Sequence, residues 1–333
     1  MESNPLMERN ESDHTWSRRP RLLLSHEIPW WQRDNEYLLS GCRPTSGSAG
    51  ASFASLAYLY NQSIKMYLHL IGCIMFFILP FYFHWHFYQP RLNARIDDLV
   101  VISVYCLGVT VCFALSAIFH IMWNDSQNLT SLCNKLDYLS ILILMWGAGI
   151  STIYYGFFCN QDLQRFYWMI TSCATLCCAI ATFRPRFASP LFRRWRVCFY
   201  GGFGLSAITY VAHGISIHGW DLQRARMSLY WMAGMATFNL AGAIIYAARV
   251  PERFIPFKFD IFGASHQLFH VAVIIAAVIL VNPHSILCEG YRNAATVEVV
   301  LFVIVEPRLW GYSLRYFPHG VHTVSKSEEY SQD

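Results

Sequence analysis

Charged side chains are scarce in this chain. Asp, Glu, Lys and Arg together make up 14% of its 333 residues, whereas an ordinary soluble domain carries roughly 25%. The scarcity excludes an ordinary soluble enzyme. The first 60 residues lack the basic start and apolar core of a cleavable signal peptide, so we expect the first apolar stretch to direct insertion. The eleven cysteines form no C-x-x-C pair, and most lie in apolar stretches, where cysteine behaves as a small apolar residue.

Long apolar stretches are what the chain does have, and hydrophobic residues make up 55% of it. A helix needs about 20 mostly apolar residues to cross a bilayer. The sequence therefore predicts an all-α membrane protein, a bundle of seven transmembrane helices. The predicted spans are Met66–Phe83, Leu99–Trp123, Leu136–Phe158, Phe166–Phe183, Val197–Ser216, Ser228–Ala248 and Ala264–Val281.

The orientation follows from the excess of Lys and Arg in cytosolic loops. The connection from Arg184 to Arg196 holds five arginines, and the alternate connections hold fewer basic residues or balance them with acids. We therefore expect a cytosolic N-terminus and an extracytosolic C-terminus. The expected regions are a cytosolic segment with a juxtamembrane helix (1–65), the bundle (66–283) and an extracytosolic tail (284–333). The net charge of +4 is spread over loops that border spans and does not indicate nucleic-acid binding.

A pair of histidines, His266 and His270, lies at the start of the seventh predicted span. Residues four apart share one face of a helix, so both imidazoles could bind one Zn²⁺. Metal-binding side chains at a membrane helix indicate a functional site by default. Hydrogen bonds between helices, with no metal, are the alternative for such a pair taken alone.

The predicted topology adds residues from two other spans. His120 lies near the cytosolic end of span two, one turn after Ser116, and Asp137 lies in the expected first turn of span three. His120, Asp137 and the pair His266 and His270 would thus share one layer. Three imidazoles and a water form a known catalytic zinc arrangement. Asp137 could serve this water as a base or hydrogen-bond acceptor, with Ser116 bonding the same water or a substrate oxygen.

Two of these residues have other interpretations. The Ser116 hydroxyl could bond the backbone of its own helix. Asp137 could pair with Lys135 at a helix start, where a negative charge suits the helix dipole. The remaining histidines are weaker candidates: His84 and His86 diverge on a helix, His213 and His218 lie near the other membrane face, and His69 is expected to pack or to hydrogen-bond.

At these residues the chain resembles the progestin and adipoQ receptor family, which is related to the haemolysin III proteins and more distantly to alkaline ceramidases. The joint pattern S-x-x-x-H, D and H-x-x-x-H carries the resemblance, together with Asp34–Gly41, Asn134–Tyr138 and Tyr246–Phe254. The last segment is similar to the adiponectin-receptor branch, which includes fungal members tied to zinc and lipid homeostasis. Asn61–His69 departs from the family pattern, which usually has an acid and a tryptophan there.

The resemblance implies a zinc ion held by His120, His266 and His270, with Asp137 and Ser116 around its water, in a bundle oriented opposite to G-protein-coupled receptors. The leading hypothesis is a zinc hydrolase of membrane lipid amides such as ceramide, in the plasma membrane or an endomembrane, governed by an extracellular protein ligand. A receptor with a structural zinc is the alternative. A zinc transporter is disfavoured, because no acids or histidines continue the layer across the membrane.

Overall fold

In the computed structural model, residues 21–88, 96–184, 187 and 190–286 are described. The chain divides into a unit of residues 1–291 and a unit of residues 292–333. The expected extracytosolic tail lies almost wholly outside the described residues. Within the described part of the first unit the secondary structure is helical, apart from an isolated β-bridge between Leu23 and Cys42.

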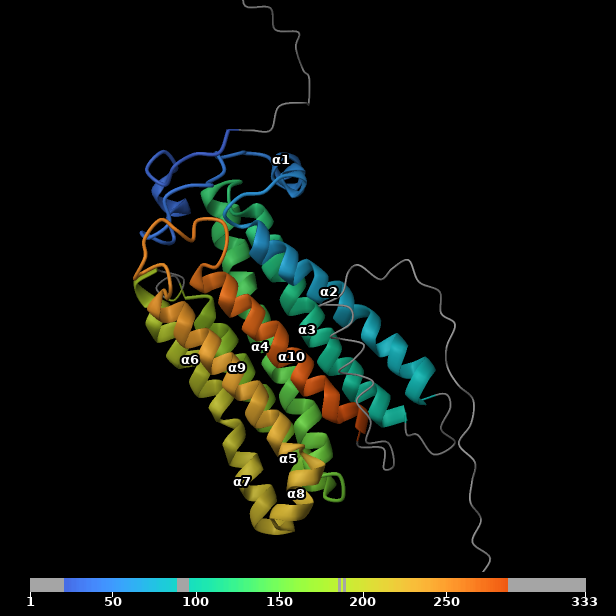
Figure 1. Cartoon of the computed structure of the whole chain (residues 1–333). Helices are drawn as coiled ribbons and strands as arrows, with labels where there is room; N and C mark the ends of the chain where they lie inside the picture. The colour runs from blue at the N-terminus through green and yellow to red at the C-terminus, as the bar shows by residue number, and fades with distance from the viewer. Residues whose placement is uncertain (1–20, 89–95, 185–186, 188–189, 287–333) are drawn as a thin grey trace, which may run out of the picture. The chain divides into compact units, whose positions relative to one another are not determined.

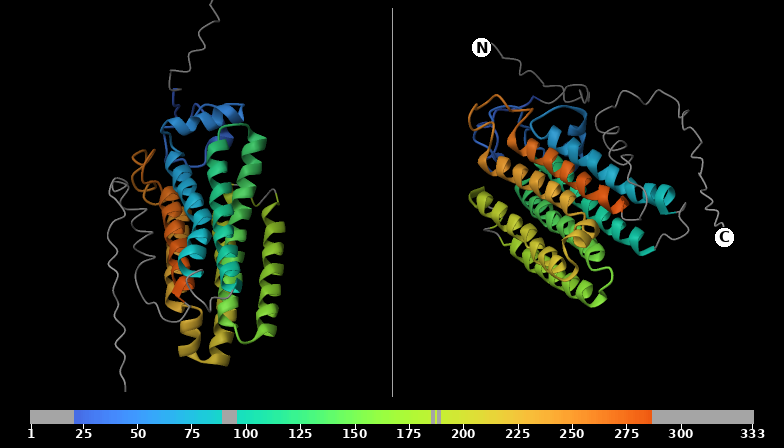
Figure 2. Two further views of the ribbon diagram at one scale, coloured as in Figure 1. Left: turned by 90° about the vertical axis from the view of Figure 1, so that its right-hand side faces the viewer. Right: turned by 60° about the horizontal axis from the view of Figure 1, so that its bottom comes forward.

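Long helices lie side by side in the first unit (Figures 1 and 2). The long helices are α2 (Ser63–Phe83), α3 (Ile96–Met122), α4 (Gln127–Gly156), α5 (Gln161–Thr182), α6 (Arg193–Leu205), α7 (Ala207–His218), α9 (Leu229–Ala248) and α10 (Ser265–Ile286). Short elements connect or extend them: α1 (Ala49–Ala54), α8 (Trp220–Arg226), three 3₁₀ turns, η1 (Trp30–Gln32), η2 (Ser55–Ala57) and η4 (Pro190–Phe192), and one π-helical turn, η3 (His84–Tyr88).

Four of these helices are long and apolar enough to cross a membrane: α2 with its extension to His86, α3, α4 and α9. A shorter apolar stretch, Ser265–Val281, forms most of α10. Many large apolar side chains on the helices are exposed, for example Ile71, Phe77 and Leu107 at 56–60%. Exposure of this kind is expected where helices face lipid, and the chain is an integral, multi-pass membrane protein.

The predicted fifth span is divided at one residue. The sequence predicts one helix over Val197–Ser216, but α6 ends at Leu205 and α7 begins at Ala207. Ser206 lies at the junction, and its hydroxyl donates a hydrogen bond to the backbone carbonyl of Phe203. Three glycines just before the junction, Gly201, Gly202 and Gly204, lower the helix propensity of this segment.

The third predicted span begins earlier than its hydropathy indicates. Helix α4 starts at Gln127, where the Ser126 hydroxyl accepts a hydrogen bond from the Leu129 amide. Serine is a favoured residue at this capping position. The prediction that Asp137 lies in the first turn is therefore wrong: ten residues of the same helix precede it.

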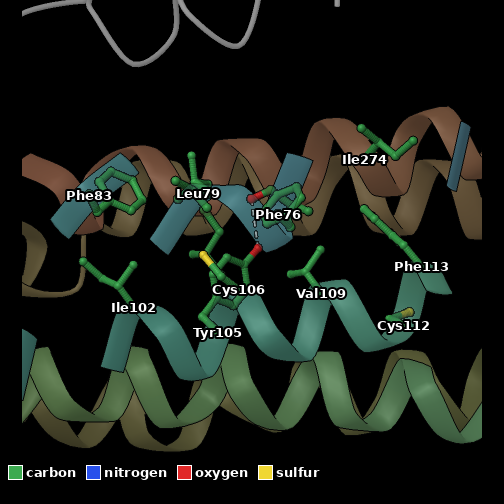
Figure 3. Close-up of a cluster of buried hydrophobic side chains, with 13 residues drawn as sticks. Phe76, Leu79, Phe83, Ile102, Tyr105, Cys106, Val109, Cys112, Phe113 and Ile274 are labelled. Carbon is green, nitrogen blue, oxygen red and sulfur yellow. Dashed lines mark hydrogen bonds between the residues drawn. The ribbon is translucent and has the colours of Figure 1, made fainter. Parts of the chain in front are cut away.

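A hydrophobic core joins α2, α3 and α10 (Figure 3). Phe76 and Phe113 meet edge to face with ring centroids 5.9 Å apart. The Tyr105 hydroxyl donates to the carbonyl of Ala277 at 2.9 Å, which satisfies a buried polar group and ties α3 to α10. This core lies next to the histidine-bearing ends of α3 and α10 and fixes their spacing.

Helices α3 and α4 approach closely through glycines. A Cβ added to Gly108 would lie 3.1 Å from the carbonyl oxygen of Ile143, and one added to Gly147 would lie 3.2 Å from that of Val104. Small residues let membrane helices come close enough for backbone contact. This approach brings Asp137, on α4, to the helix that carries Ser116 and His120.

The segment from residue 21 to the start of α2 covers one end of the bundle and contacts the loop between α9 and α10 (Figure 1). Asp260 accepts hydrogen bonds from the amides of Leu39 and Ser40, and the Phe257 amide donates to the carbonyl of Tyr37. The part of this segment just before α2, where the juxtamembrane helix was expected, contains α1 and η2, and Tyr60 after them is fully buried while Phe53 is 47% exposed.

Candidate metal centre

Three histidines from two helices converge at the covered end of the bundle. His120 lies in the last turn of α3, and His266 and His270 lie in the first two turns of α10. One ring nitrogen from each lies within 4.8 Å of the others. His120 and His270 are buried and His266 is partly buried. The sequence expectation that these three histidines share a layer agrees with this geometry.

Neighbouring groups orient two of the three rings. The His120 Nδ1 lies 3.1 Å from Oε1 of Gln62, the residue before α2. An amide oxygen only accepts, so Nδ1 carries the proton and Nε2 keeps its lone pair. The His270 ring hydrogen-bonds the backbone carbonyl of Lys65. Proteins commonly orient the histidine ligands of a metal through hydrogen bonds from groups that do not themselves bind the metal.

The donor atoms fit a metal ion. His120 Nε2, His266 Nδ1 and His270 Nδ1 are buried and have no hydrogen-bond partner among the described residues. Orphaned buried polar atoms are uncommon in native structures and each calls for an explanation. Nitrogens bound to one tetrahedral zinc ion at about 2.0–2.1 Å lie about 3.4 Å apart, and the nitrogens of this cluster lie within 4.8 Å of one another. The buried group could therefore hold a metal ion.

Asp137 lies on α4 and is tied to the turn before His120. Its carboxylate accepts a hydrogen bond from the Ser116 side chain, and Ser116 is 2% exposed. This contact joins α4 to α3. Asp137 is not one of the residues whose donor atoms lie within 4.8 Å of one another. Among the described residues, the cluster therefore offers three protein ligands.

His69, on α2, packs against the cluster. Its ring stacks on His270 with centroids 3.8 Å apart and on Phe113 at 4.6 Å. Neither of its ring nitrogens has a hydrogen-bond partner among the described residues, although both are buried. Of the two roles expected from sequence, the structure supports packing.

The other histidines lie elsewhere. His84 stacks on Tyr88 at the far end of α2. His213 hydrogen-bonds the Tyr167 hydroxyl at 2.7 Å, in a separate cluster around Phe157. Neither belongs to the histidine group of the candidate centre.

Glu252 holds the start of α10, a role that the sequence reasoning did not assign. This carboxylate is fully buried in the loop after α9. Its Oε2 accepts from the Ser265 amide at 2.7 Å, and its Oε1 accepts from the Ser265 hydroxyl and, at 2.9 Å, from Asn35 Nδ2. The first amide of a helix has no partner within the helix. Glu252 supplies that partner one residue before His266.

Arg43 anchors the end of α3. Its guanidinium donates to the backbone carbonyl of His120 at 2.9 Å and to the Ser55 hydroxyl, and it lies over the Tyr60 ring. Burial lowers the pKa of Arg43, while the nearby Tyr60 opposes the shift. The N-terminal segment thus contacts α3 directly, and it contacts the loop that leads into α10. One indication of the roles of Gln62, Arg43 and Glu252 was present in the sequence: each is a polar residue close to a long apolar stretch.

Comparisons with known proteins agree with the pattern of these residues. The haemolysin-III related family model matches residues 57–281. The chain is 34% identical over 252 residues to the adiponectin receptor protein of Drosophila melanogaster. The aligned region covers 76% of this chain and 56% of that protein. The chain is also 34% identical over 258 residues to the ADIPOR-like receptor IZH2 of Saccharomyces cerevisiae, covering 78% of this chain and 81% of that protein.

A plant relative is more distant. The chain is 29% identical over 266 residues to heptahelical transmembrane protein 1 of Arabidopsis thaliana, covering 78% of this chain and 79% of that protein. The matches to animal relatives cover less of those proteins: 56% of the Drosophila protein and 60% of a Caenorhabditis elegans progestin and adipoQ receptor-like protein. The shared region contains the candidate centre.

Proposed function

Because the chain belongs to the haemolysin-III related family of adiponectin receptor-like membrane proteins, we propose that it is a zinc-dependent hydrolase of membrane lipid amides of the ceramide type. The observation that supports this most directly is the group of three imidazoles with buried, unpartnered nitrogens, one of them a turn after Ser116, which hydrogen-bonds Asp137. Three protein ligands leave a coordination position open, as in catalytic zinc sites, whereas closed structural sites usually have four.

We further propose that the bundle spans the membrane seven times, with the histidine end cytosolic. Helix α5, the pair α6 and α7, and α10 would add three spans to the four that meet the length and hydropathy criterion. The arginine-rich connection before α6 supports the orientation. A tag at the N-terminus should stay inaccessible in intact cells while a C-terminal tag is labelled. The opposite labelling would overturn the orientation.

The chemistry divides between the metal and the chain. A zinc ion held by His120, His266 and His270 would supply Lewis acidity to a carbonyl and lower the pKa of a water molecule. Asp137 would accept the proton of the attacking water, with Ser116 fixing the orientation of the carboxylate. The amide C–N bond breaks, the water oxygen joins the acyl carbon, and the proton goes to the amine. The products are a fatty acid and a free amine.

The test is a pair of matched variants of the full chain in lipid nanodiscs. Asp137→Asn keeps the size of the side chain and leaves the histidines intact, so zinc content should stay near one per chain while ceramide turnover falls by at least 100-fold. Asp162→Asn, in the exposed first turn of α5, is the control and should change neither.

Histidine variants test the metal separately. His120→Ala and His270→Ala should each lose most of the bound zinc, measured by elemental analysis, while the exposed His26→Ala should retain it. Full zinc retention in both cluster variants would refute the metal site. Normal zinc with undiminished turnover in Asp137→Asn would refute the catalytic role.

His69 favours a second candidate function, a receptor whose zinc is structural. Its unpartnered nitrogens lie beside His270 and could complete a closed site of four histidines. His69→Phe keeps the stacking ring but removes both nitrogens. Retained zinc would favour the open, catalytic site, whereas a loss of zinc as large as in His120→Ala would favour the structural one.

A further inference from the structure

A pocket rich in arginine lies between the start of α6 and the end of α9. Its volume is about 420 Å³, within the range of small-molecule sites. Arg193, Arg194, Arg249 and Arg253 contribute to its lining, with Glu36 as the one carboxylate and Trp195 as an aromatic wall. Two of the four guanidinium groups face a carboxylate, Arg249 that of Glu36 and Arg193 that of Asp34, so the net positive charge comes from Arg194 and Arg253. The candidate metal centre uses none of these residues.

Arg193 is the group in this pocket that most needs a partner. It is 6% exposed, and all three of its guanidinium nitrogens lack a hydrogen bond among the described residues. The nearest carboxylate, that of Asp34, lies 4.0 Å away, and the guanidinium lies over the ring of Tyr246 at 3.8 Å. Asp34 supplies an opposite charge but no hydrogen bond, so the donors of this buried guanidinium lack acceptors among the described residues, which is costly.

The start of α6 adds to the attraction for an anion. Arg193 is the first residue of this helix of 13 residues, and the preceding residue, Phe192, makes no capping hydrogen bond with its side chain. The positive end of the helix dipole therefore lies beside the arginines. Helix starts of this kind bind phosphate groups readily.

Exposed apolar side chains surround the positive pocket. Leu191 is 92% exposed, Trp195 is 64% exposed and Phe254, in the loop after α9, is 75% exposed. Large apolar side chains with this exposure suit contact with acyl chains, and tryptophan is enriched where membrane meets water. The combination of apolar rim and arginine-lined interior matches the two parts of a membrane lipid, its chains and its head group.

We infer that this pocket binds the phosphate of an anionic membrane lipid, with Arg194 and Arg253 around the phosphate oxygens, the buried charge of Arg193 behind them, and Trp195 beside the glycerol and acyl chains. Arginine suits phosphate because its planar guanidinium donates two parallel hydrogen bonds. Arg249 is engaged by Glu36 at 3.0 Å and serves to shape the pocket. The site is independent of the proposed hydrolase activity.

The binding test uses the purified full chain in neutral detergent. Native mass spectrometry measures retention of phosphatidic acid, with phosphatidylcholine and inorganic phosphate as separate probes. Phosphatidic acid should bind at least 10-fold more tightly than either. Equal binding of phosphatidylcholine would refute the role of the anionic group, and equal binding of inorganic phosphate would refute a lipid as the ligand.

The variants separate the pocket from the total charge. Arg194→Gln with Arg253→Gln removes two exposed pocket arginines and should weaken phosphatidic acid binding at least 10-fold. Arg165→Gln with Arg224→Gln removes the same charge from α5 and α8 and should leave binding within about 2-fold. Both double variants should keep the wild-type melting temperature. Equal weakening by both double variants, or no weakening by the pocket double variant, would refute the site.

Discussion

Glu252→Gln tests whether the loop after α9 holds the metal-binding end of α10 in place. The wild-type carboxylate is fully buried and accepts three hydrogen bonds, two from Ser265 and one from Asn35. Glutamine has nearly the same shape but only one accepting oxygen. Its amide nitrogen would face a donor of Ser265 or Asn35, so at least one buried donor would lose its partner.

The expected loss can be worked out from these contacts. A hydrogen bond to a charged group contributes about 1.5–3 kcal/mol, and a buried donor left unpaired costs about 1–3 kcal/mol. Loss of one contact and weakening of the others should lower the free energy of unfolding by about 2–3 kcal/mol. For a domain of 150–250 residues, about 1 kcal/mol shifts the melting temperature by about 2–4 °C. We therefore expect a decrease of about 4–12 °C.

The assay is thermal unfolding in detergent with and without added zinc, at matched protein concentration. Glu36→Gln is the control, because Glu36 is 69% exposed and makes an ion pair with Arg249, and exposed pairs contribute little. Zinc affinity should also fall about 10-fold in Glu252→Gln, because the first turn of α10 carries His266. Glu252→Gln with wild-type stability and zinc affinity would refute the role of Glu252.

Three further changes test other contacts. Gln62→Ala removes the acceptor that holds Nδ1 of His120 and should lower zinc affinity about 10–100-fold by competition titration; unchanged affinity would contradict it. Gly108→Leu should lower the melting temperature by at least 5 °C or prevent expression, since its Cβ would lie 3.1 Å from a backbone oxygen of α4; normal stability would contradict close packing. Burial alone would raise the pKa of Asp34, but Arg193 and other cations outweigh burial and hold that pKa below 3.8. The ionised carboxylate therefore stabilises the fold above about pH 4, and this stabilisation is lost as the pH falls through the lowered pKa. Asp34→Asn should therefore be less stable at pH 7 and should lose less stability than the wild type between pH 5 and 3; parallel curves would contradict it.

The apolar stretches predicted helix positions well but not helix ends. Hydropathy finds residues that lipid can accept, and α4 extends beyond them into the polar residues from Gln127 to Lys135. Only Leu129, Leu132 and Cys133 form an apolar stripe there, and three residues barely raise the average hydropathy. The break at Ser206 was likewise hidden, because a single serine among apolar residues and glycines barely changes a hydropathy average.

The convergence of the three histidines could be predicted because it depends on topology rather than on side-chain detail. Two imidazoles four residues apart share a helix face by geometry alone. His120 joins them once the alternation of spans places the end of α3 and the start of α10 at the same membrane side. The ligand group required only helix order, and errors of several residues in helix ends did not affect it.

The groups that orient the histidines required knowledge of loop conformation. Gln62 and His120 are 58 residues apart, and Asn35 and Glu252 are 217 apart. No spacing rule connects residues in different loops, whereas helix periodicity connects residues within one helix. Yet these contacts decide which nitrogen of His120 is free and where α10 begins, and both must be correct for three nitrogens to meet one ion. A single sequence can therefore indicate which residues bind a metal, while the residues that make the site bind it tightly become visible only when the loops are placed.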